Sequence, residues 1–355
     1  MSFTFARCSC ATPNDTGISR RRFLATAAAA AIAAPALAQK TSRGRIDVHH
    51  HIFPREVMEV QEKLNPAWGR LRTPEPLKVW TPQAMLADMD ANEIAAVVAS
   101  NPGPGAWYGD VDGARKIMRV WNEFAAKTKA DHPRRFGFFA MIALPDVEGS
   151  LAEIAYAFDV LKADGVALYT SYDGVYPGEK KFAPVFEELN RRSAAVFFHP
   201  LVAKCCSNVV PGIPTNAYEL PFDTTRAIAS LLFSGSLAQN RNIRFIFSHA
   251  GGALPALAGR IDMLTKENKR LREAAPNGVE AELQRLFVDT AGAGTAGAMA
   301  AALAVLPPSQ ILYGSDFPYL SHAENLSLLK ERGFSNELAL RIDRSNAQAL
   351  FPGLG

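Results

Sequence analysis

The chain has 355 residues, of which 48% are hydrophobic, and it carries 38 lysines and arginines against 35 aspartates and glutamates. This composition excludes a disordered or collagen-like polymer and supplies enough apolar side chains for a large core. The formal net charge is +3, so basic side chains barely outnumber acidic ones. Proteins that bind nucleic acid need an excess of basic side chains to neutralise phosphates, and we therefore expect no nucleic-acid partner.

The first 38 residues are predicted to be an export signal. A basic run at residues 19–22 leads into an apolar stretch, residues 23–34, and small residues that suit signal peptidase follow at 36–38. The paired arginines before Phe-Leu match the twin-arginine pattern, and the apolar run is too short to span about 30 Å of hydrocarbon. We therefore predict a twin-arginine signal peptide over 1–38, a mature domain over 39–355, the twin-arginine export machinery as a partner and a periplasmic location. An ordinary alanine-rich helix is the alternative.

Removing this leader would remove four arginines and one aspartate, which leaves equal numbers of basic and acidic side chains. Two of the four cysteines also lie in the leader, and the other two, Cys205 and Cys206, are neighbours in sequence. Neighbouring cysteines can be bridged only with strain, so we expect no disulfide framework despite the oxidising destination. The stability of the fold must then come from its core.

From residue 45 onward, short runs rich in Val, Ile and Phe alternate with longer segments of helical periodicity. This alternation is typical of repeated βα units around a parallel sheet. The predicted strands are residues 45–51, 94–100, 136–143, 165–170, 195–199, 244–249, 286–289 and 311–314. The predicted helices are residues 81–92, 113–129, 150–163, 183–192, 223–239, 253–273, 295–306, 323–332 and 336–350.

Eight such units in one chain favour a single α/β domain, a (β/α)8 TIM barrel, over an open doubly wound sheet. The glycine-rich turn that binds nucleotides in the open-sheet alternative does not follow the first predicted strand. Two long connections, residues 52–80 and 200–222, each follow a predicted strand. Loops in that position lie over the C-terminal mouth of a barrel, where we expect them to shape a pocket.

Histidines and one aspartate gather at the predicted strand ends. His49 and His51 end the first strand, His199 ends the fifth, His249 ends the sixth, and Asp316 follows the eighth. Because parallel strands of a barrel end at the same mouth, we expect these side chains to converge.

The alternation of side chains along a strand places His49 and His51 on the same side and His50 on the other. Imidazole and carboxylate ligands suit Zn²⁺ or Mn²⁺, and three or four protein ligands leave a coordination position open for water or substrate. The pattern therefore predicts a catalytic metal site, with a set of core histidines that bind no ion as the alternative.

Several motifs occur in a fixed order along the chain. They are Asp47-x-His49-x-His51, His199-Pro200, His249-Ala250-Gly251-Gly252 with Gly259-Arg260, Gly314-Ser315-Asp316 and Asn346-Ala347. As an ordered set they resemble the amidohydrolase-related metalloenzymes typified by aminocarboxymuconate semialdehyde decarboxylase, a group that includes the 6-methylsalicylate and resorcylate decarboxylases. The resemblance runs over residues 46–351 and implies a barrel of the metal-dependent hydrolase type.

The resemblance implies a role for each residue at the strand ends. His49, His51, His199 and Asp316 would hold one divalent metal, with Zn²⁺ expected before Mn²⁺, and His249 would stand beside it as acid or base. Asp316 is the second candidate for the proton transfer, and the sequence does not decide between the two.

Two further features follow from the resemblance. Arg260 would recognise a substrate carboxylate, often in the site of the neighbouring protomer, which implies a homodimer. Binuclear relatives bridge two ions with a carboxylated Lys or a Glu at the end of the fourth strand, and residues 165–170 contain neither. A single ion is therefore favoured.

The main functional interpretation is non-oxidative decarboxylation of an aromatic or unsaturated small-molecule carboxylic acid. The metal would act as a Lewis acid toward the carboxylate, and Asp316 or His249 would deliver a proton to carbon. The nearest alternative is hydrolysis of a lactone, ester, amide or C–C bond by metal-bound water, with His249 as base. A periplasmic binding or metal-handling protein without turnover is the third.

The remaining candidates have less defined roles. Asp47 is expected to orient a ligand histidine, His132 is expected to be structural, and His322 lies on the active face without an assigned role. Aromatic residues in post-strand loops are expected to form a flat apolar pocket that suits an aromatic acid. These are Phe53, Trp107, Tyr108, Tyr172, Tyr176, Phe222, Phe317 and Tyr319.

Overall fold

A computed structural model describes residues 44–64, 80–101, 107, 109–206 and 209–355. The signal peptide predicted over residues 1–38 lies outside the described residues and stays a prediction. Residues 42–355 form one compact unit. Within the described ranges, no helix combines the length and the apolar character needed to cross a bilayer.

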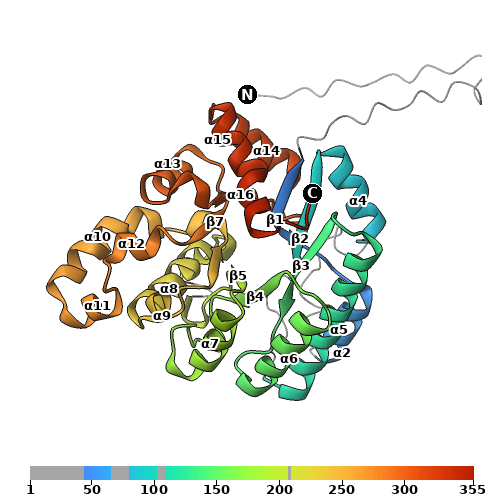
Figure 1. The fold of residues 1–355 in the computed structure, drawn as a ribbon, viewed down its shortest axis with the longest axis horizontal. Helices are drawn as coiled ribbons and strands as arrows, with labels where there is room; N and C mark the ends of the chain where they lie inside the picture. The colour runs from blue at the N-terminus through green and yellow to red at the C-terminus, as the bar shows by residue number, and fades with distance from the viewer. Residues whose placement is uncertain (1–43, 65–79, 102–106, 108, 207–208) are drawn as a thin grey trace, which may run out of the picture. The chain divides into compact units, whose positions relative to one another are not determined.

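The described chain is built around an eight-stranded parallel sheet whose strands pair in chain order (Figure 1). The strands are β1 Arg45–His51, β2 Ile94–Ser100, β3 Phe136–Met141, β4 Gly165–Tyr169, β5 Ala195–His199, β6 Arg244–Phe247, β7 Phe287–Asp289 and β8 Ile311–Leu312. The chain just after β8 returns to β1, where Val48 N donates to Tyr313 O at 3.0 Å and His51 N donates to Phe317 O at 2.8 Å. These hydrogen bonds close the sheet, so the predicted (β/α)8 barrel is confirmed.

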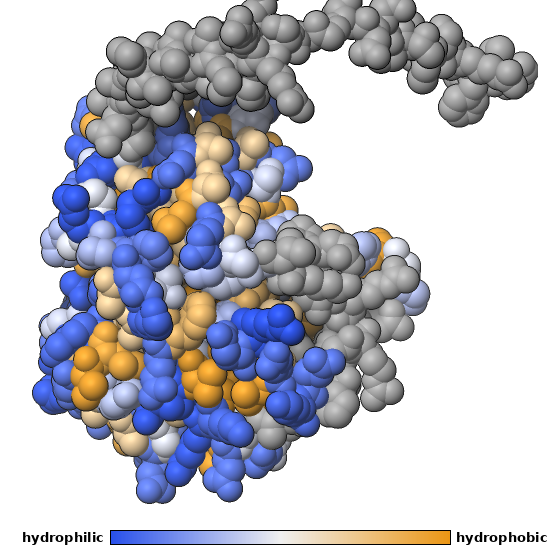
Figure 2. All heavy atoms as spheres, turned by 90° about the vertical axis from the view of Figure 1, so that its right-hand side faces the viewer, coloured by the Kyte–Doolittle hydropathy of each residue, from blue (hydrophilic) through white to orange (hydrophobic). Residues whose placement is uncertain are grey.

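Helices cover the outside of the sheet (Figure 1). They are α2 Arg55–Leu64, α4 Pro82–Ala91, α5 Val111–Asp131, α6 Val147–Asp159, α7 Ala183–Arg191, α8 Glu219–Phe233, α9 Ser236–Gln239, α10 Leu254–Glu267, α11 Lys269–Ala274, α12 Val279–Leu283, α13 Ala296–Val305, α14 His322–Lys330, α15 Asn336–Leu340 and α16 Asn346–Leu350. On the face in Figure 2, hydrophilic residues cover most of the described surface, with smaller hydrophobic areas between them.

Two hydrophobic clusters hold these layers together. The larger one lies between strands and helices and includes Trp121 and Phe198, both completely buried. The smaller one takes the alternate strand side chains, such as Phe139 and Phe197, whose stacked rings have centroids 5.2 Å apart. Phe351 packs against the smaller cluster from the C-terminal end of the chain. In most strands the period-2 alternation therefore supplies one face to each cluster, and β1 supplies Ile46 and Val48 to the smaller one alone.

The helices depart from the predicted ranges where local polar or glycine residues end them. The helix predicted over 253–273 is broken at Asn268, which is extended and whose side chain accepts a hydrogen bond from Leu271 N. The helix predicted over 223–239 is broken at Gly235, whose φ of 81° lies in the left-handed region. The connection over 52–80 contains a helix, α2, that was not predicted.

The connection after β5 contains short 3-10 turns at Lys204–Cys206 and Thr215–Ala217. The structure joins Cys205 to Cys206 in a disulfide. The bridge links adjacent residues in one turn and ties no distant parts of the fold together. Among the described residues, stability therefore still rests on the core rather than on a disulfide framework.

Candidate active site

An irregularity in β1 sets the direction of its histidines. Val48 belongs to the inner hydrophobic cluster, and the next side chain, His49, also faces inward, with its ring centroid 5.1 Å from that of Phe197. The pairing of β1 with β2 shifts register between Asp47 and His50, and such a bulge re-aims the side chains that follow it. His49 and His51 therefore share the inner side, as the alternation predicted.

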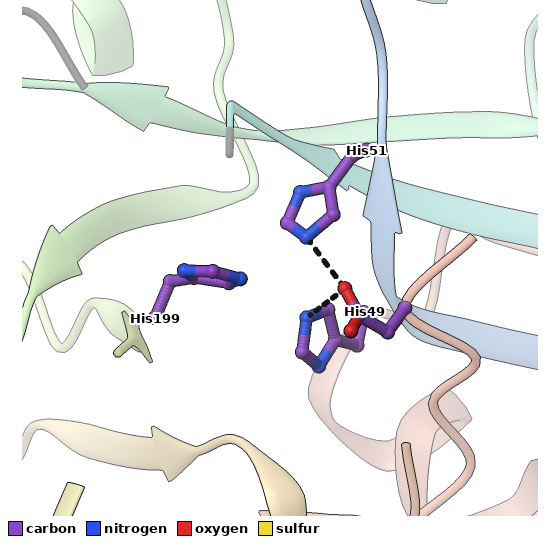
Figure 3. Close-up of side chains that lie close together, drawn as sticks. His49, His51 and His199 are labelled. Atoms are coloured by element: carbon purple, nitrogen blue, oxygen red, sulfur yellow. Dashed lines mark hydrogen bonds and ion pairs between the residues drawn. The ribbon is translucent and has the colours of Figure 1, made fainter. Parts of the chain in front are cut away.

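The four predicted metal ligands meet at the mouth of the barrel. His49, His51, His199 and Asp316 each offer one ligand atom, and these atoms all lie within 4.8 Å of one another. Asp316 Oδ1 lies 3.2 Å from His49 Nε2 and 3.0 Å from His51 Nε2 (Figure 3). Ligands held about 2.0–2.1 Å from one tetrahedral ion stand at about this separation.

Each imidazole is oriented through its other ring nitrogen. The Nδ1 partners of His49, His51 and His199 are Asp289 Oδ2 at 2.9 Å, Ser100 Oγ at 3.1 Å and Pro200 O at 3.0 Å. Because His49 Nδ1 faces the Asp289 carboxylate and His199 Nδ1 donates to the Pro200 carbonyl, both residues are left with Nε2 as the ligand atom. His49 Nε2 is buried, and Asp316 Oδ1 lies 3.2 Å from it. Buried Nε2 atoms gathered around a carboxylate fit a divalent ion.

Burial and neighbouring charges shift the pKa values of the four ligands in different directions. Burial lowers the pKa of His51 and, more strongly, that of His199. Burial also acts to lower the pKa of His49, but the charges of Asp289 and Asp316 outweigh it and raise this pKa to about 10. Although burial acts to raise it, the pKa of Asp316 is held well below its usual value by His49 and His51. An ion that binds here meets an ionised carboxylate and displaces a proton from His49.

We expect the stability of the metal-free protein to fall as the pH rises from 6.5 to about 10. The pKa of His49 is raised from 6.5 to about 10 in the folded state, so its contribution is complete below the unfolded pKa and is lost as the pH passes the folded one. The free energy of unfolding of the chelator-treated protein, measured by denaturant titration across this range, tests the prediction. The decrease should be smaller in Asp289→Asn, and a flat profile in the wild type would contradict it.

Asp289 at the end of β7 is a site residue that was not predicted. Its Oδ2 accepts from His49 Nδ1 at 2.9 Å, and its Oδ1 accepts from His249 N at 3.0 Å and from Ala291 N at 3.0 Å. One buried carboxylate thus positions both a metal ligand and the backbone of the candidate acid/base. An acidic residue that ends an apolar strand run was the available sequence signal.

Asp289→Asn should weaken metal binding about 10- to 100-fold, because outer partners of a ligand histidine contribute to affinity by that amount. A neutral amide keeps the shape of the side chain but not the charge that holds His49 Nδ1. Competition of the ion with a chelator of known affinity measures the effect. Asp164→Asn, which removes the carboxylate that pairs with Lys129 outside the cluster, is the control, and equal affinities in the two variants would contradict the role of Asp289.

The turn that carries Asp316 depends on close contacts with β1. A Cβ at Gly314 would lie 2.8 Å from Asp289 Cβ and 2.9 Å from His49 Cβ, so only glycine fits there. Asp316 itself has φ of 61°, and its backbone N donates to His49 O at 2.8 Å. Left-handed backbone at a non-glycine residue is typical of functional sites.

Asp47 supports this turn rather than an imidazole of the four-ligand cluster, which corrects its predicted role. Its Oδ1 accepts from His49 N and from Ser315 N, both at 3.0 Å, and its Oδ2 accepts from Ser315 Oγ at 2.6 Å. The imidazole that it holds is that of His50, whose Nδ1 donates to Oδ2 at 3.1 Å. Asp47 therefore fixes two backbone segments that carry metal ligands.

His249 stands beside the metal cluster without belonging to it. It begins a 3-10 turn, His249–Gly251, and its Nδ1 donates to Ala291 O at 2.8 Å. Its ring centroid lies 5.0 Å from that of His49 and 6.4 Å from that of His199. Nε2 is thus the atom at which His249 can accept or release a proton.

A cavity of about 670 Å³ opens over the cluster. It is lined by His199, Pro200, Leu201, Val202, Asn216, Ala217, Leu220, Pro221, His249, Gly252, Gly292, Ala293, Ala298, Asp316, Tyr319 and Leu320. Of the aromatic residues predicted to form it, Tyr108 lies outside the described residues, and Tyr319 is the one that lines the cavity among those described. Within the described part of the chain the walls are mainly aliphatic, so the predicted aromatic lining is reduced there to Tyr319. Rings such as Tyr172 instead seal the hydrophobic core.

The other candidates lie away from this cavity. Arg260 is exposed on α10 and is not among the lining residues, so a single chain does not bring it to the cluster. His132 follows α5 as its C-terminal cap, next to the start of β3, which agrees with its predicted structural role. His322 is buried and contacts Tyr313 rather than the cavity.

Comparison with known proteins supports the family resemblance. A family model described as amidohydrolase matches residues 46–353. The decarboxylase yanB of Aspergillus niger is 34% identical over 326 residues, covering 87% of this chain and 87% of that protein. The 6-methylsalicylic acid decarboxylase of Penicillium expansum is 32% identical, covering 87% of this chain and 97% of that protein.

The fold is shared with a solved decarboxylase. The crystal structure of 5-carboxyvanillate decarboxylase from Novosphingobium aromaticivorans, in complex with manganese and 4-hydroxy-3-methoxy-5-nitrobenzoic acid, superposes with a TM-score of 0.79 at 21% identity. The superposition covers 89% of this chain and 97% of that one. The family model matches nearly all of the residues that follow the predicted leader. This match and the relative that is 34% identical show that the chain belongs to the amidohydrolase family.

Proposed function

We propose that this protein is a metal-dependent non-oxidative decarboxylase of an aromatic or unsaturated carboxylic acid. The observation that carries the proposal is the cluster of His49, His51, His199 and Asp316, of which His199 and Asp316 line a largely aliphatic cavity. Relatives that match most of this chain are named decarboxylases, two of them acting on 6-methylsalicylic acid. Such a cavity accepts an apolar ring while the polar floor receives its carboxylate.

The ion, when bound, supplies Lewis-acid chemistry toward the substrate carboxylate. His49, His51 and His199 hold their Nε2 atoms toward one point because their Nδ1 atoms are engaged elsewhere. The C–C bond to the carboxyl group breaks, CO2 leaves, and the electron pair that stays on carbon takes up a proton. His249 Nε2 and an Asp316 carboxylate oxygen are the two atoms placed to deliver it.

Stoichiometric CO2 release tests the reaction. The metal-loaded full chain is incubated with a panel of salicylate-type acids that includes 6-methylsalicylate, and CO2 and the decarboxylated product are both measured. One CO2 for each acid consumed is the expected result. Failure on the whole panel, together with hydrolysis of lactones or esters, would overturn the proposal in favour of a hydrolase on the same site. Solvent ¹⁸O in the product marks that hydrolase, with His249 as its base.

For the ion we propose Zn²⁺, with Mn²⁺ as the alternative. Three imidazoles and one carboxylate are a donor set that Zn²⁺ prefers. Two relatives by fold, the carboxyvanillate decarboxylase and a dihydroxybenzoic acid decarboxylase from Polaromonas, were solved with manganese. Metal analysis of protein purified without added metal decides between the two ions.

For localisation we propose that residues 1–38 are a twin-arginine signal and that residues 39–355 are a periplasmic domain exported by the twin-arginine machinery. The support is the sequence pattern around Arg20 and Arg21. The double variant Arg20→Lys and Arg21→Lys should stay in the cytoplasm at full length, whereas the wild type should appear in the periplasm shortened at its N-terminus. Equal export of both would contradict the proposal.

We propose a homodimer in which Arg260 reaches the substrate carboxylate of the neighbouring protomer. Arg260 is exposed, and Leu257, Met263 and Leu264 on the same helix are 39%, 55% and 46% exposed. Apolar side chains exposed together in this way are typical of interaction surfaces.

Arg260→Ala should raise the KM for the acid about 10-fold or more, because a charge-assisted hydrogen bond is lost. The fall in kcat should be smaller. Steady-state kinetics, together with the mass in solution, test this prediction, and Arg270→Ala, which removes an exposed cation on α11, is the control. A monomer, or an unchanged KM in Arg260→Ala, would contradict the role of Arg260.

A further inference from the structure

A second group of buried polar side chains lies outside the catalytic cavity. It consists of Asp47 and His50 on β1 and His322 at the start of α14, which are 0%, 0% and 1% exposed. One ligand atom from each lies within 4.8 Å of the others. None of the three belongs to the four-ligand cluster or lines the catalytic cavity.

The two imidazoles of this group are oriented in the same way as the ligands of the catalytic cluster. His50 Nδ1 donates to Asp47 Oδ2 at 3.1 Å, and His322 Nδ1 lies 3.0 Å from the Tyr313 hydroxyl. Their Nε2 atoms are buried and have no hydrogen-bond partner among the described residues. Buried polar atoms are nearly always paired, so two such atoms in one group point to a missing ligand.

A third unpaired atom faces His322 from a different helix. Asp88 on α4 receives a hydrogen bond from Asn92 on Oδ1 at 3.2 Å. Its Oδ2 is buried and unpaired among the described residues, and it lies 3.5 Å from His322 Nε2. Two ligands of one tetrahedral Zn²⁺ stand at about this separation.

The charge of the group also lacks a permanent counterion. Among the described residues, the basic groups within ion-pair distance of Asp47 are the imidazoles of His50 and His322, and for Asp88 it is that of His322. Asp47 is completely buried, and a buried carboxylate without a permanent counterion is stabilised by a bound cation.

Aromatic packing holds the two imidazoles in place. The ring of Phe317 stacks on His50 with centroids 4.9 Å apart and on His322 with centroids 5.4 Å apart. Neither imidazole can turn away without breaking these contacts and its Nδ1 hydrogen bond.

We propose that the group of Asp47, His50 and His322, with Asp88 facing His322, binds a second divalent cation of the Zn²⁺ class. Tyr313 orients the imidazole of His322. These ligands come from β1, α14 and α4, so the cation joins the first strand to the last βα unit where the barrel closes. It lies outside the cavity and is structural, whereas the catalytic ion is held by the other group. Two imidazoles and a carboxylate are a common Zn²⁺ donor set, and partners on Nδ1 strengthen such sites.

Metal stoichiometry of the full chain tests this site without any substrate, so the result is independent of the reaction. Protein is stripped with chelator, reloaded with Zn²⁺, dialysed and measured by mass spectrometry for bound zinc per chain. We expect two ions in the wild type and one in His322→Gln and in Asp88→Asn. His199→Gln, in the catalytic cluster, should also hold one.

The variants together distinguish loss of the site from loss of the fold. Asp88 has a side chain that is 33% exposed, so Asp88→Asn is a mild change, and the single ion it retains should disappear in the double variant with His199→Gln. One ion in the wild type would overturn the proposal, and ordered water would then be the partner of the unpaired atoms. Two ions in both His322→Gln and Asp88→Asn would overturn it as well.

Discussion

Asp316→Asn should reduce turnover of the acid substrate by about 10³-fold or more and weaken metal binding in the same variant. The Oδ1 atom of Asp316 lies 3.2 Å from His49 Nε2 and 3.0 Å from His51 Nε2, so the cluster loses its negative charge when the carboxylate becomes an amide. The variant also loses one of the two atoms placed to deliver the proton. Measurements of kcat/KM and of bound metal, each at several metal concentrations, separate the two losses.

The response to added metal decides what Asp316 does. If turnover stays low when the site is saturated with metal, Asp316 takes part in the proton transfer as well as in binding. If turnover returns to the wild-type value, Asp316 acts as a ligand and the proton comes from His249. Unchanged metal affinity and unchanged turnover would contradict the site.

His249→Asn should slow turnover by about 10²- to 10⁴-fold, the usual contribution of a general acid or base, while bound metal stays at the wild-type level. His249 lies outside the four-ligand cluster, and its ring centroid is 5.0 Å from that of His49. Its Nδ1 is fixed by Ala291 O, so the substitution removes Nε2 from the cavity without removing a ligand. Single-turnover kinetics together with metal analysis measure both quantities.

His132→Asn provides the matched control for a histidine substitution. His132 caps α5 and is far in sequence from any residue that lines the cavity. Its turnover and metal content should match those of the wild type. Loss of metal in His249→Asn would show that this residue is a ligand, contrary to the assignment.

The barrel and its ligand cluster were predictable because both follow from local patterns. Most strands are short apolar runs, and His51 and His199 are the last residues of β1 and β5. Parallel strands that end at one mouth bring such residues together whatever the loops do. Predicting the fold therefore required only the alternation of strand and helix patterns along the sequence.

The features that were missed depend on contacts that local patterns do not contain. Asp289 follows a two-residue apolar run in β7, and its importance appears only when His49 and His249 are both placed beside it. The aliphatic cavity walls depend on which loop side chains turn inward, as Leu201 and Leu220 do. Such choices are made by tertiary packing rather than by sequence periodicity.

The helix breaks have a similar explanation. At Asn268 a side-chain hydrogen bond to the backbone replaces the helical one. Within a long run of helix-forming residues, the sequence gives little indication that a side chain will replace a helical hydrogen bond at one position. Asp88 is likewise an ordinary polar position of α4, and its contact with His322 arises from the closure of the barrel.

The ligands of the catalytic cluster are spread from His49 to Asp316, and the backbone of Asp316 is held by hydrogen bonding to His49. On the ribosome, three of the four ligands emerge long before the last one. A nascent chain therefore has no complete pocket for the ion until residue 316 has left the exit tunnel and docked against the first strand. Binding of the ion by all four ligands would therefore follow the synthesis and docking of this turn.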